Sequence, residues 1–281
     1  MRNIDFGMPT LIEISSLHEN VELCKRLGLK FIELNMNFPE YQLDSLEERI
    51  EEIYQEADNA GIYYTIHLDE NLNIADFNPL VRNAYSETVR RTIEVAKKLY
   101  PLYEKYGRYT EQALTINMHM NHGIYITLPN RKVQLYAEKK DVYMDFFRHF
   151  IKDVETWIGD FNIKIVIENT DGFKDYEITA IDELLKSNYF GLTWDIGHSK
   201  AVKEKDVAFI ESHMDKLIHM HVHDGTEEPP KNHLALGTGS INLTQRLDTA
   251  ECVRAKCVLE TKTIVALEKS VRWLDKELIK E

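Results

Sequence analysis

The chain has 281 residues, of which 43% are hydrophobic, and its 34 Lys and Arg against 47 Asp and Glu give a formal net charge of −13. A parallel barrel takes roughly 250 residues as one domain, so we expect residues 1–281 to form a single domain with a sizeable core. The negative charge repels phosphates, which argues against a nucleic-acid partner.

Cysteine usage and hydrophobicity exclude two further classes. The cysteines Cys24, Cys252 and Cys257 are odd in number and lack CxxC spacing, which indicates neither a disulfide framework nor a thiolate metal site. No apolar run approaches the roughly 18 residues of a membrane span, and the first 16 residues lack the continuous apolar segment of a secretion signal. We therefore predict a cytoplasmic protein without membrane association.

Short apolar runs alternate with helical patterns along the whole chain. The runs are rich in Ile, Val, Phe, Tyr and Leu, which favour strands. We expect strands at residues 3–8, 30–36, 63–68, 113–120, 164–169, 190–196, 217–223 and 256–262. The clearest helical patterns lie at residues 46–61, 78–99, 141–159 and 263–281.

Local signals support two of the helix boundaries. Gly61 follows Asn59 and Ala60 as a helix stop, and Asn78 before Pro79 is a cap followed by the residue best tolerated at the first helical position. Strands alternating with helices indicate a parallel sheet, and eight units in this length predict a single α/β domain, a (β/α)8 TIM barrel. The alternative, a doubly wound open sheet, needs a GxGxxG motif after the first strand, and the chain has none.

Two connections stand out by length and polarity. Residues 122–140 follow the fourth expected strand and residues 224–240 follow the seventh, so both belong on the face with the carboxyl ends of the strands. Long loops on that face usually bind or cover substrate. The Tyr-rich residues 100–113 precede a strand and belong on the opposite face.

Four metal-binding side chains stand at the ends of consecutive expected strands: Glu168, Asp195, His221 and Glu260. Carboxylate oxygens and imidazole nitrogens suit a divalent ion such as Mn, Zn, Co or Mg. Side chains two residues apart share a strand face, so each candidate ligand follows an inward-facing neighbour. We expect the four to converge at the barrel mouth.

Further polar residues are expected around the same mouth. His67 and His119 end the third and fourth strands and are candidates for a second ion or for substrate, with His122 close enough to compete with His119. Candidates for binding substrate are His198, His233, Glu33 and Asn35. His18, His149 and His213 fall in helical segments and are interpreted as surface or core residues.

The set made by His67, His119, Glu168, the DIGH motif at Asp195–His198, the HMHVHD motif around His221, and the VLET motif at Glu260 resembles the xylose-isomerase-like barrel superfamily. The similarity extends over nearly the whole chain. It implies one divalent ion held by the four strand-end residues, with both glutamates as acid and base and His198 on the substrate. The superfamily also includes family-2 apurinic endonucleases, in which the matches to His67, His119, His198 and His233 help to hold further zinc ions.

The resemblance implies a small sugar-like substrate and an isomerase or epimerase that transfers a proton through an enediolate, with Glu168 and Glu260 as catalytic residues. The sequence does not choose between isomerisation and epimerisation. Two alternatives stay open: a metal-dependent phosphoesterase using His67 and His119, and a metal-dependent sugar sensor. The sugar, its phosphorylation, the metal and any homo-oligomer are also left open.

Overall fold

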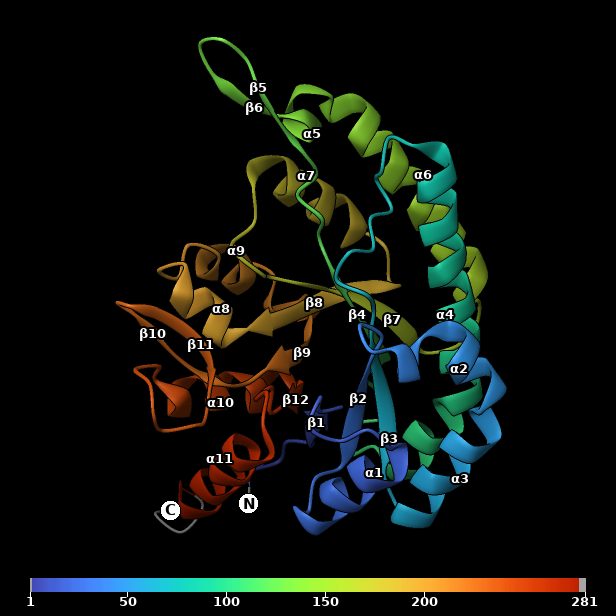
Figure 1. Ribbon diagram of the computed structural model, residues 1–281, viewed down its shortest axis with the longest axis vertical. Helices are drawn as coiled ribbons and strands as arrows, with labels where there is room; N and C mark the ends of the chain where they lie inside the picture. Colours follow the sequence, from blue (N-terminus) through green and yellow to red (C-terminus); the bar gives the residue numbers. More distant parts are fainter. Residues whose placement is uncertain (1, 278–281) are drawn as a thin grey trace.

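In a computed structural model that describes residues 2–277, eight parallel strands close into a barrel surrounded by helices (Figure 1). The ring order is β1-β12-β9-β8-β7-β4-β3-β2. Its strands are β1 (Phe6–Pro9), β2 (Phe31–Asn35), β3 (Tyr63–His67), β4 (Leu114–His119), β7 (Ile163–Glu168), β8 (Phe190–Asp195), β9 (Leu217–His221) and β12 (Lys256–Val258). All eight expected strands and the barrel are confirmed.

Helices cover the outside of the barrel. They are α1 (Leu17–Arg26), α2 (Leu43–Glu48), α3 (Ile50–Ala60), α4 (Pro79–Tyr106), α5 (Leu135–Glu138), α6 (Lys140–Ile158), α7 (Asp175–Leu184), α8 (Ile196–Ala201), α9 (Val207–Glu211), α10 (Leu243–Val253) and α11 (Ile264–Glu277), with 3₁₀ turns η1 (Pro39–Tyr41) and η2 (Met214–Lys216). Within residues 2–277, no helix is long and apolar enough to cross a membrane.

The expected end of α3 and the expected start of α4 are confirmed, but the single helix expected at residues 46–61 is divided at Arg49 between α2 and α3, and α4 ends later than expected. Gly61 adopts a left-handed conformation at the end of α3, and the Asn78 side chain accepts the Leu80 N–H. The helix pattern was expected to stop at residue 99, yet α4 continues through Pro101 to Tyr106. Buried Tyr103 explains the continuation. Its ring packs against that of Tyr63, with 5.0 Å between the ring centroids, and adds apolar contact beyond the proline. Residues 278–281 of the last expected helix lie outside the described residues.

A layer of polar side chains fills the barrel interior below its mouth. Glu33 Oε2 on β2 lies 3.2 Å from His219 Nε2 on β9. Because β2 and β9 are not neighbours in the ring, both side chains point into the barrel interior. Thr65, Asn117 and Thr193 join them through side-chain hydrogen bonds. All of these residues are at most 1% exposed. Barrel interiors are usually packed with Val, Ile and Leu, so this layer marks the end of the barrel that carries chemistry.

The two long loops both contain short hairpins that the sequence patterns did not indicate. β5 (Tyr125–Thr127) pairs with β6 (Lys132–Gln134), and this hairpin extends away from the barrel (Figure 1). β10 (Asp224–Glu227) pairs with β11 (Pro230–Leu234) and carries His233. Both hairpins follow barrel strands at their carboxyl ends, as the loop positions predicted.

Candidate active site

Strand register brings the expected ligands to the same depth at the barrel mouth. Asp195 pairs with His221, and His221 pairs with Val258, two residues before Glu260. Glu168 ends β7 beside β8. The four side chains Glu168, Asp195, His221 and Glu260 are buried, and one donor atom from each lies within 4.8 Å of the other three.

His221 lies at the centre of this cluster. Its Nε2–H donates to Glu33 Oε1 at 2.9 Å, which leaves Nδ1 as the nitrogen that faces the carboxylates. Nδ1 lies 3.3 Å from Glu168, 3.2 Å from Glu260 and 3.9 Å from Asp195. A carboxylate that holds the second nitrogen is the usual way in which a metal-ligating histidine is oriented.

The donor atoms fit a divalent cation. Within residues 2–277, His221 Nδ1 and Glu260 Oε2 are fully buried and have no hydrogen-bond partner. Burial lowers the pKa of His221, but the charges of Glu168, Glu260 and Glu33 outweigh it and raise that pKa well above its usual value. Three carboxylates around one imidazole therefore demand positive charge, which a proton or a metal ion can supply.

Glu168 is fixed by residues on β3 and β4. Its Oε2 accepts hydrogen bonds from Asn117 and from His119 Nε2, the latter at 3.0 Å, and lies 3.5 Å from His67 Nε2. Burial alone lowers the pKa of His67, but the neighbouring Glu168 carboxylate raises it to about 9. His67 and His119 thus both adjoin Glu168 Oε2, and these are the residues that would be available to a second ion.

Asp195 is held from both sides of its carboxylate. Oδ1 accepts the backbone N–H of His198 at 2.6 Å, and Oδ2 accepts His223 Nε2–H at 3.0 Å. The first bond also caps the short helix α8. Gly197 is required beside this contact, since a Cβ there would lie 1.9 Å from the His223 ring.

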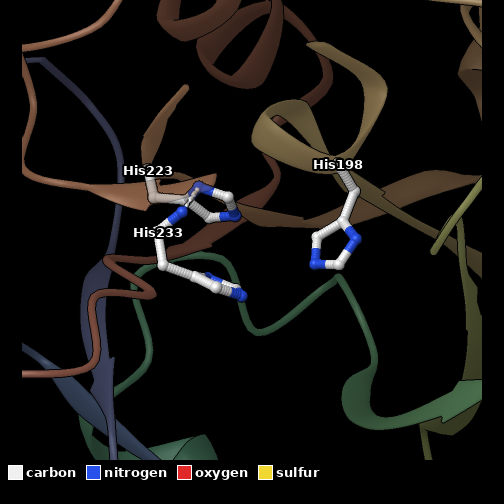
Figure 2. Close-up of side chains that lie close together, drawn as sticks. All are labelled: His198, His223 and His233. Atoms are coloured by element: carbon white, nitrogen blue, oxygen red, sulfur yellow. Dashed lines mark hydrogen bonds between the residues drawn. The ribbon is translucent and has the colours of Figure 1, made fainter. Parts of the chain in front are cut away.

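Three histidines lie close together beside the ligand cluster: His198 from α8, His223 from the link between β9 and β10, and His233 from β11 (Figure 2). Both nitrogens of His223 are used, because Nε2 donates to Asp195 and Nδ1 accepts the backbone N–H of His233 at 2.7 Å. His198 and His233 direct Nδ1 to backbone carbonyl oxygens at 2.9 and 3.1 Å, so their Nε2 atoms remain for a ligand. Burial lowers the pKa of His233 to about 4, which keeps that ring neutral.

The remaining expected residues differ in their access to the mouth. Glu33 is 1% exposed and lies beneath His221. It therefore orients the His221 ring and is not open to the barrel mouth. Asn35 accepts the Asn37 N–H at 2.9 Å through its side-chain oxygen. Asp224, which follows His223, accepts backbone N–H groups of Gly225, Gly239 and Ile241, and thereby shapes the loop after β11.

The structure separates the roles of His119 and His122. His119 faces Glu168, as described above. His122 lies between Glu177 and Asp171, and within residues 2–277 it forms no ion pair with the four expected ligands. The carboxylates of Asp171 and Glu177 outweigh burial and raise the pKa of His122 to about 9. His122 therefore joins the start of the β5–β6 hairpin to α7.

Several contacting residues were missed by sequence reasoning. Asn117 precedes His119 by two residues, and Lys262 follows Glu260 by two, so the strand alternation that marked the ligands also contained them. Lys262 Nζ lies 2.7 Å from Glu260 Oε1. His223 stands two residues after His221, so the same alternation contained it as well, and its Nε2 contacts Asp195 Oδ2.

A closed barrel with buried carboxylates and imidazoles at the carboxyl ends of its strands places the chain among the TIM barrels. A family model described as xylose isomerase-like TIM barrel matches residues 21–277, and the chain belongs to that family. No curated protein matches its sequence.

Solved structures of similar fold include sugar epimerases. The chain is similar to 3-keto-D-glucoside 4-epimerase from E. coli, with 13% identity, a TM-score of 0.71, and coverage of 97% of this chain and 99% of that one. D-psicose 3-epimerase from Clostridium cellulolyticum H10 gives 13% identity, a TM-score of 0.69, and coverage of 97% and 98%. A probable 3-DHS dehydratase from Bacillus anthracis gives 11% identity, a TM-score of 0.70, and coverage of 97% and 99%. At these identities the likeness concerns the fold alone.

Chelation should destabilise the protein if an ion binds the four donors. An ion at about 100 times its Kd adds about 2.7 kcal/mol to the free energy of unfolding, which is a rise of about 5 °C in Tm for a chain of this size. We expect EDTA to lower Tm and Mn²⁺ or Zn²⁺ to restore it, measured by differential scanning fluorimetry. His221→Ala should abolish this response and His213→Ala should keep it. An unchanged Tm with no ion in elemental analysis would contradict the prediction.

The His122 contact should make stability depend on pH. Because the folded-state pKa of about 9 exceeds the unfolded value, the stabilisation is fully present below about pH 6.5 and is lost as pH rises through about 9. His122→Ala should cost about 3 kcal/mol at pH 6.5, since it leaves buried Glu177 unpaired. Urea unfolding at pH 6.5 and 9.5 measures both effects. Equal losses at the two pH values would show that the charge of His122 is not involved.

Proposed function

We propose that the protein is a divalent-metal-dependent sugar isomerase or epimerase that transfers a proton at a carbon beside a carbonyl group. The observation that carries this proposal is the convergence of three carboxylates on His221 Nδ1, with that atom and Glu260 Oε2 buried and unpartnered. The fold shared with sugar epimerases supports the choice of reaction. The ion we propose is Mn, Zn, Co or Mg.

An ion held by Glu168, Asp195, His221 and Glu260 would act as a Lewis acid on the carbonyl and hydroxyl oxygens of a ketose. The remaining chemistry falls to the side chains. Glu168 and Glu260 approach His221 Nδ1 from different strands, at 3.3 and 3.2 Å, so a substrate carbon between them would present a C–H bond to one or both. Proton removal and return on opposite faces gives epimerisation, and a single shuttling base gives isomerisation.

The side chains of Glu168 and Glu260 differ in the number of contacts that hold them and in their exposure. Both oxygens of Glu168 are engaged, one with Asn117 and His119 and the other beside His221, and its side chain is 2% exposed. Glu260 is 8% exposed and its Oε1 contacts only the half-exposed Lys262 among residues 2–277. We therefore assign proton abstraction first to Glu260. His198 and His233, with side chains 23% and 18% exposed, would hydrogen-bond substrate hydroxyl groups.

A metal-dependent phosphoesterase is the second candidate. Its supporting observation is that His67 and His119 both face Glu168 Oε2, which could then bridge two ions about 3.5–4 Å apart. The formal charge of −13 weakens this reading for a nucleic-acid substrate. A cytoplasmic location and self-association stay predictions from sequence.

Turnover in deuterated water tests the proposed reaction. A panel of neutral and phosphorylated ketoses is incubated with the metal-loaded protein, and NMR follows both product formation and deuterium at the exchanged carbon. Near-complete incorporation indicates two bases, and partial retention indicates one. Glu260→Gln keeps shape but removes basicity, so turnover should fall about 10²- to 10⁴-fold. The exposed Glu228→Gln variant is the matched control.

Metal content must be measured in each variant, because a Glu260→Gln protein that loses its ion gives no information on basicity. A metal-replete Glu260→Gln protein with undiminished exchange would reduce Glu260 to a ligand. The base would then be sought among Glu168, His198 and His223.

Binding to an abasic-site duplex separates the two candidates. We expect weak association at physiological salt and a shallow dependence on salt concentration, because few phosphates are neutralised. Fluorescence anisotropy at several salt concentrations measures both quantities, and gel analysis detects strand cleavage. Multiple-turnover nicking by the metal-loaded protein would make the phosphoesterase the better proposal.

A further inference from the structure

Lys262 is the one lysine or arginine within residues 2–277 that forms an ion pair with any of the four proposed ligands. Its Nζ lies 2.7 Å from Glu260 Oε1, and half of its side chain is exposed, at 50%. Within residues 2–277, the other side chains paired with the three ligand carboxylates are imidazoles and the Asn117 amide. Lys262 is therefore a half-exposed cation at the mouth, held by its contact with Glu260.

The charges of the proposed ligands indicate why a lysine lies beside Glu260. Among the proposed ligands, three carboxylates and one divalent ion leave one negative charge, and Lys262 supplies a matching positive one; the further carboxylate of Glu33 is paired with His219 and His221. Its partner oxygen is Glu260 Oε1, while Oε2 is the oxygen near His221. Lys262 therefore neutralises the half of Glu260 that does not face the proposed ion.

Proton abstraction moves this negative charge. When Glu260 takes the proton of a C–H bond, the C–H bond breaks, an O–H bond forms on the carboxylate, and the electron pair passes to the carbonyl oxygen of the substrate. Glu260 becomes neutral and the substrate becomes an enediolate anion, with total charge unchanged. A cation paired with Glu260 before the step then lies beside the new anion after it, where electrostatic stabilisation is most effective.

We propose that Lys262 is a further catalytic residue, whose ammonium group passes from Glu260 to the substrate oxygen that becomes negative. This inference rests on the proposed isomerase or epimerase function. A lysine suits the task, because its ammonium is a compact charge with three donors on a flexible stem. The substrate class that follows is a neutral ketose, since Lys262 is already paired with Glu260 and no second lysine or arginine within residues 2–277 forms an ion pair with the proposed ligands.

Two ligands distinguish binding of the anion from binding of a neutral sugar. Glycolohydroxamate forms a planar anion that mimics an enediolate, and glycolamide is its neutral counterpart. Calorimetry on the Mn²⁺-loaded protein should show tighter binding of the hydroxamate. Lys262→Met should lower hydroxamate affinity about tenfold or more, leave glycolamide affinity unchanged, and lower kcat about 10²-fold with little change in KM.

Matched variants separate this role from loss of charge or structure. Lys205→Met removes a lysine that has no ion pair within residues 2–277 and lines a groove outside the ligand cluster, so it should behave as wild type. Lys262→Arg keeps the charge and should restore part of the hydroxamate affinity. Elemental analysis should find unchanged metal in Lys262→Met, because removing a neighbouring cation does not weaken a cation site.

Each contrary outcome has a distinct meaning. If Lys262→Met loses the ion, Lys262 holds Glu260 in place and the catalytic role is wrong. If it loses only turnover of phosphorylated or carboxylated ketoses, Lys262 anchors an anionic substituent and the role is again wrong. Undiminished turnover and hydroxamate binding in a metal-replete Lys262→Met protein also overturn it. If the wild type neither prefers the hydroxamate nor converts any ketose, the proposed function fails, and this inference with it.

Discussion

The hydrogen bond from His221 Nε2 to Glu33 is the interaction on which the site depends. It fixes the imidazole so that Nδ1, and not Nε2, faces Glu168, Glu260 and Asp195. Without it the ring could rotate or exchange tautomers, and three carboxylates would lack a common partner. Glu33 is in turn held by Thr65 at 3.1 Å and lies 3.2 Å from His219. The orientation of an imidazole on β9 is thus set by side chains on β2 and β3, which are not neighbours of β9 in the ring.

The polar layer below the mouth explains how a buried carboxylate can have this role. An isolated charge in the barrel interior would be too costly, but each member here has partners from neighbouring strands. Thr193 donates to Asn117 at 2.6 Å, and Asn117 donates to Glu168. The layer therefore connects Glu33 below His221 with Glu168 beside it. Its rigidity holds the ligands in position and leaves little freedom for Glu168.

Much of the barrel and the four strand-end donors could be predicted from sequence, because parallel strands bring their carboxyl ends to one edge and side chains alternate with period two. The same alternation did not reveal the hairpins β5–β6 and β10–β11, whose pairing depends on support from the barrel. It also gave no reason for α4 to pass Pro101, since that helix depends on tertiary packing of Tyr103.

The choice between His119 and His122 could not be made from sequence either. The chain becomes irregular after β4 ends at His119, and the ring three positions later faces Glu177 instead of Glu168. Lys262 shows a different limit. Its spacing from Glu260 was visible, but a lysine two residues after a strand-end ligand is usually a solvated side chain. Only the 2.7 Å contact with Glu260 Oε1 distinguishes it.

The two glutamates define an asymmetric site on a nearly symmetric barrel. Glu168 is held by the buried Asn117 and the partly buried His119, and loss of these hydrogen bonds would leave a buried carboxylate oxygen unpaired. Glu260 is paired with a flexible, half-exposed ammonium that can move at little cost. Proton transfer moves negative charge from the base to the substrate. Within residues 2–277, a lysine ammonium pairs with Glu260, and no lysine or arginine pairs with Glu168. Under the proposed function, this difference supports Glu260 as the base that acts first and Glu168 as the carboxylate that stays ionised or returns the proton.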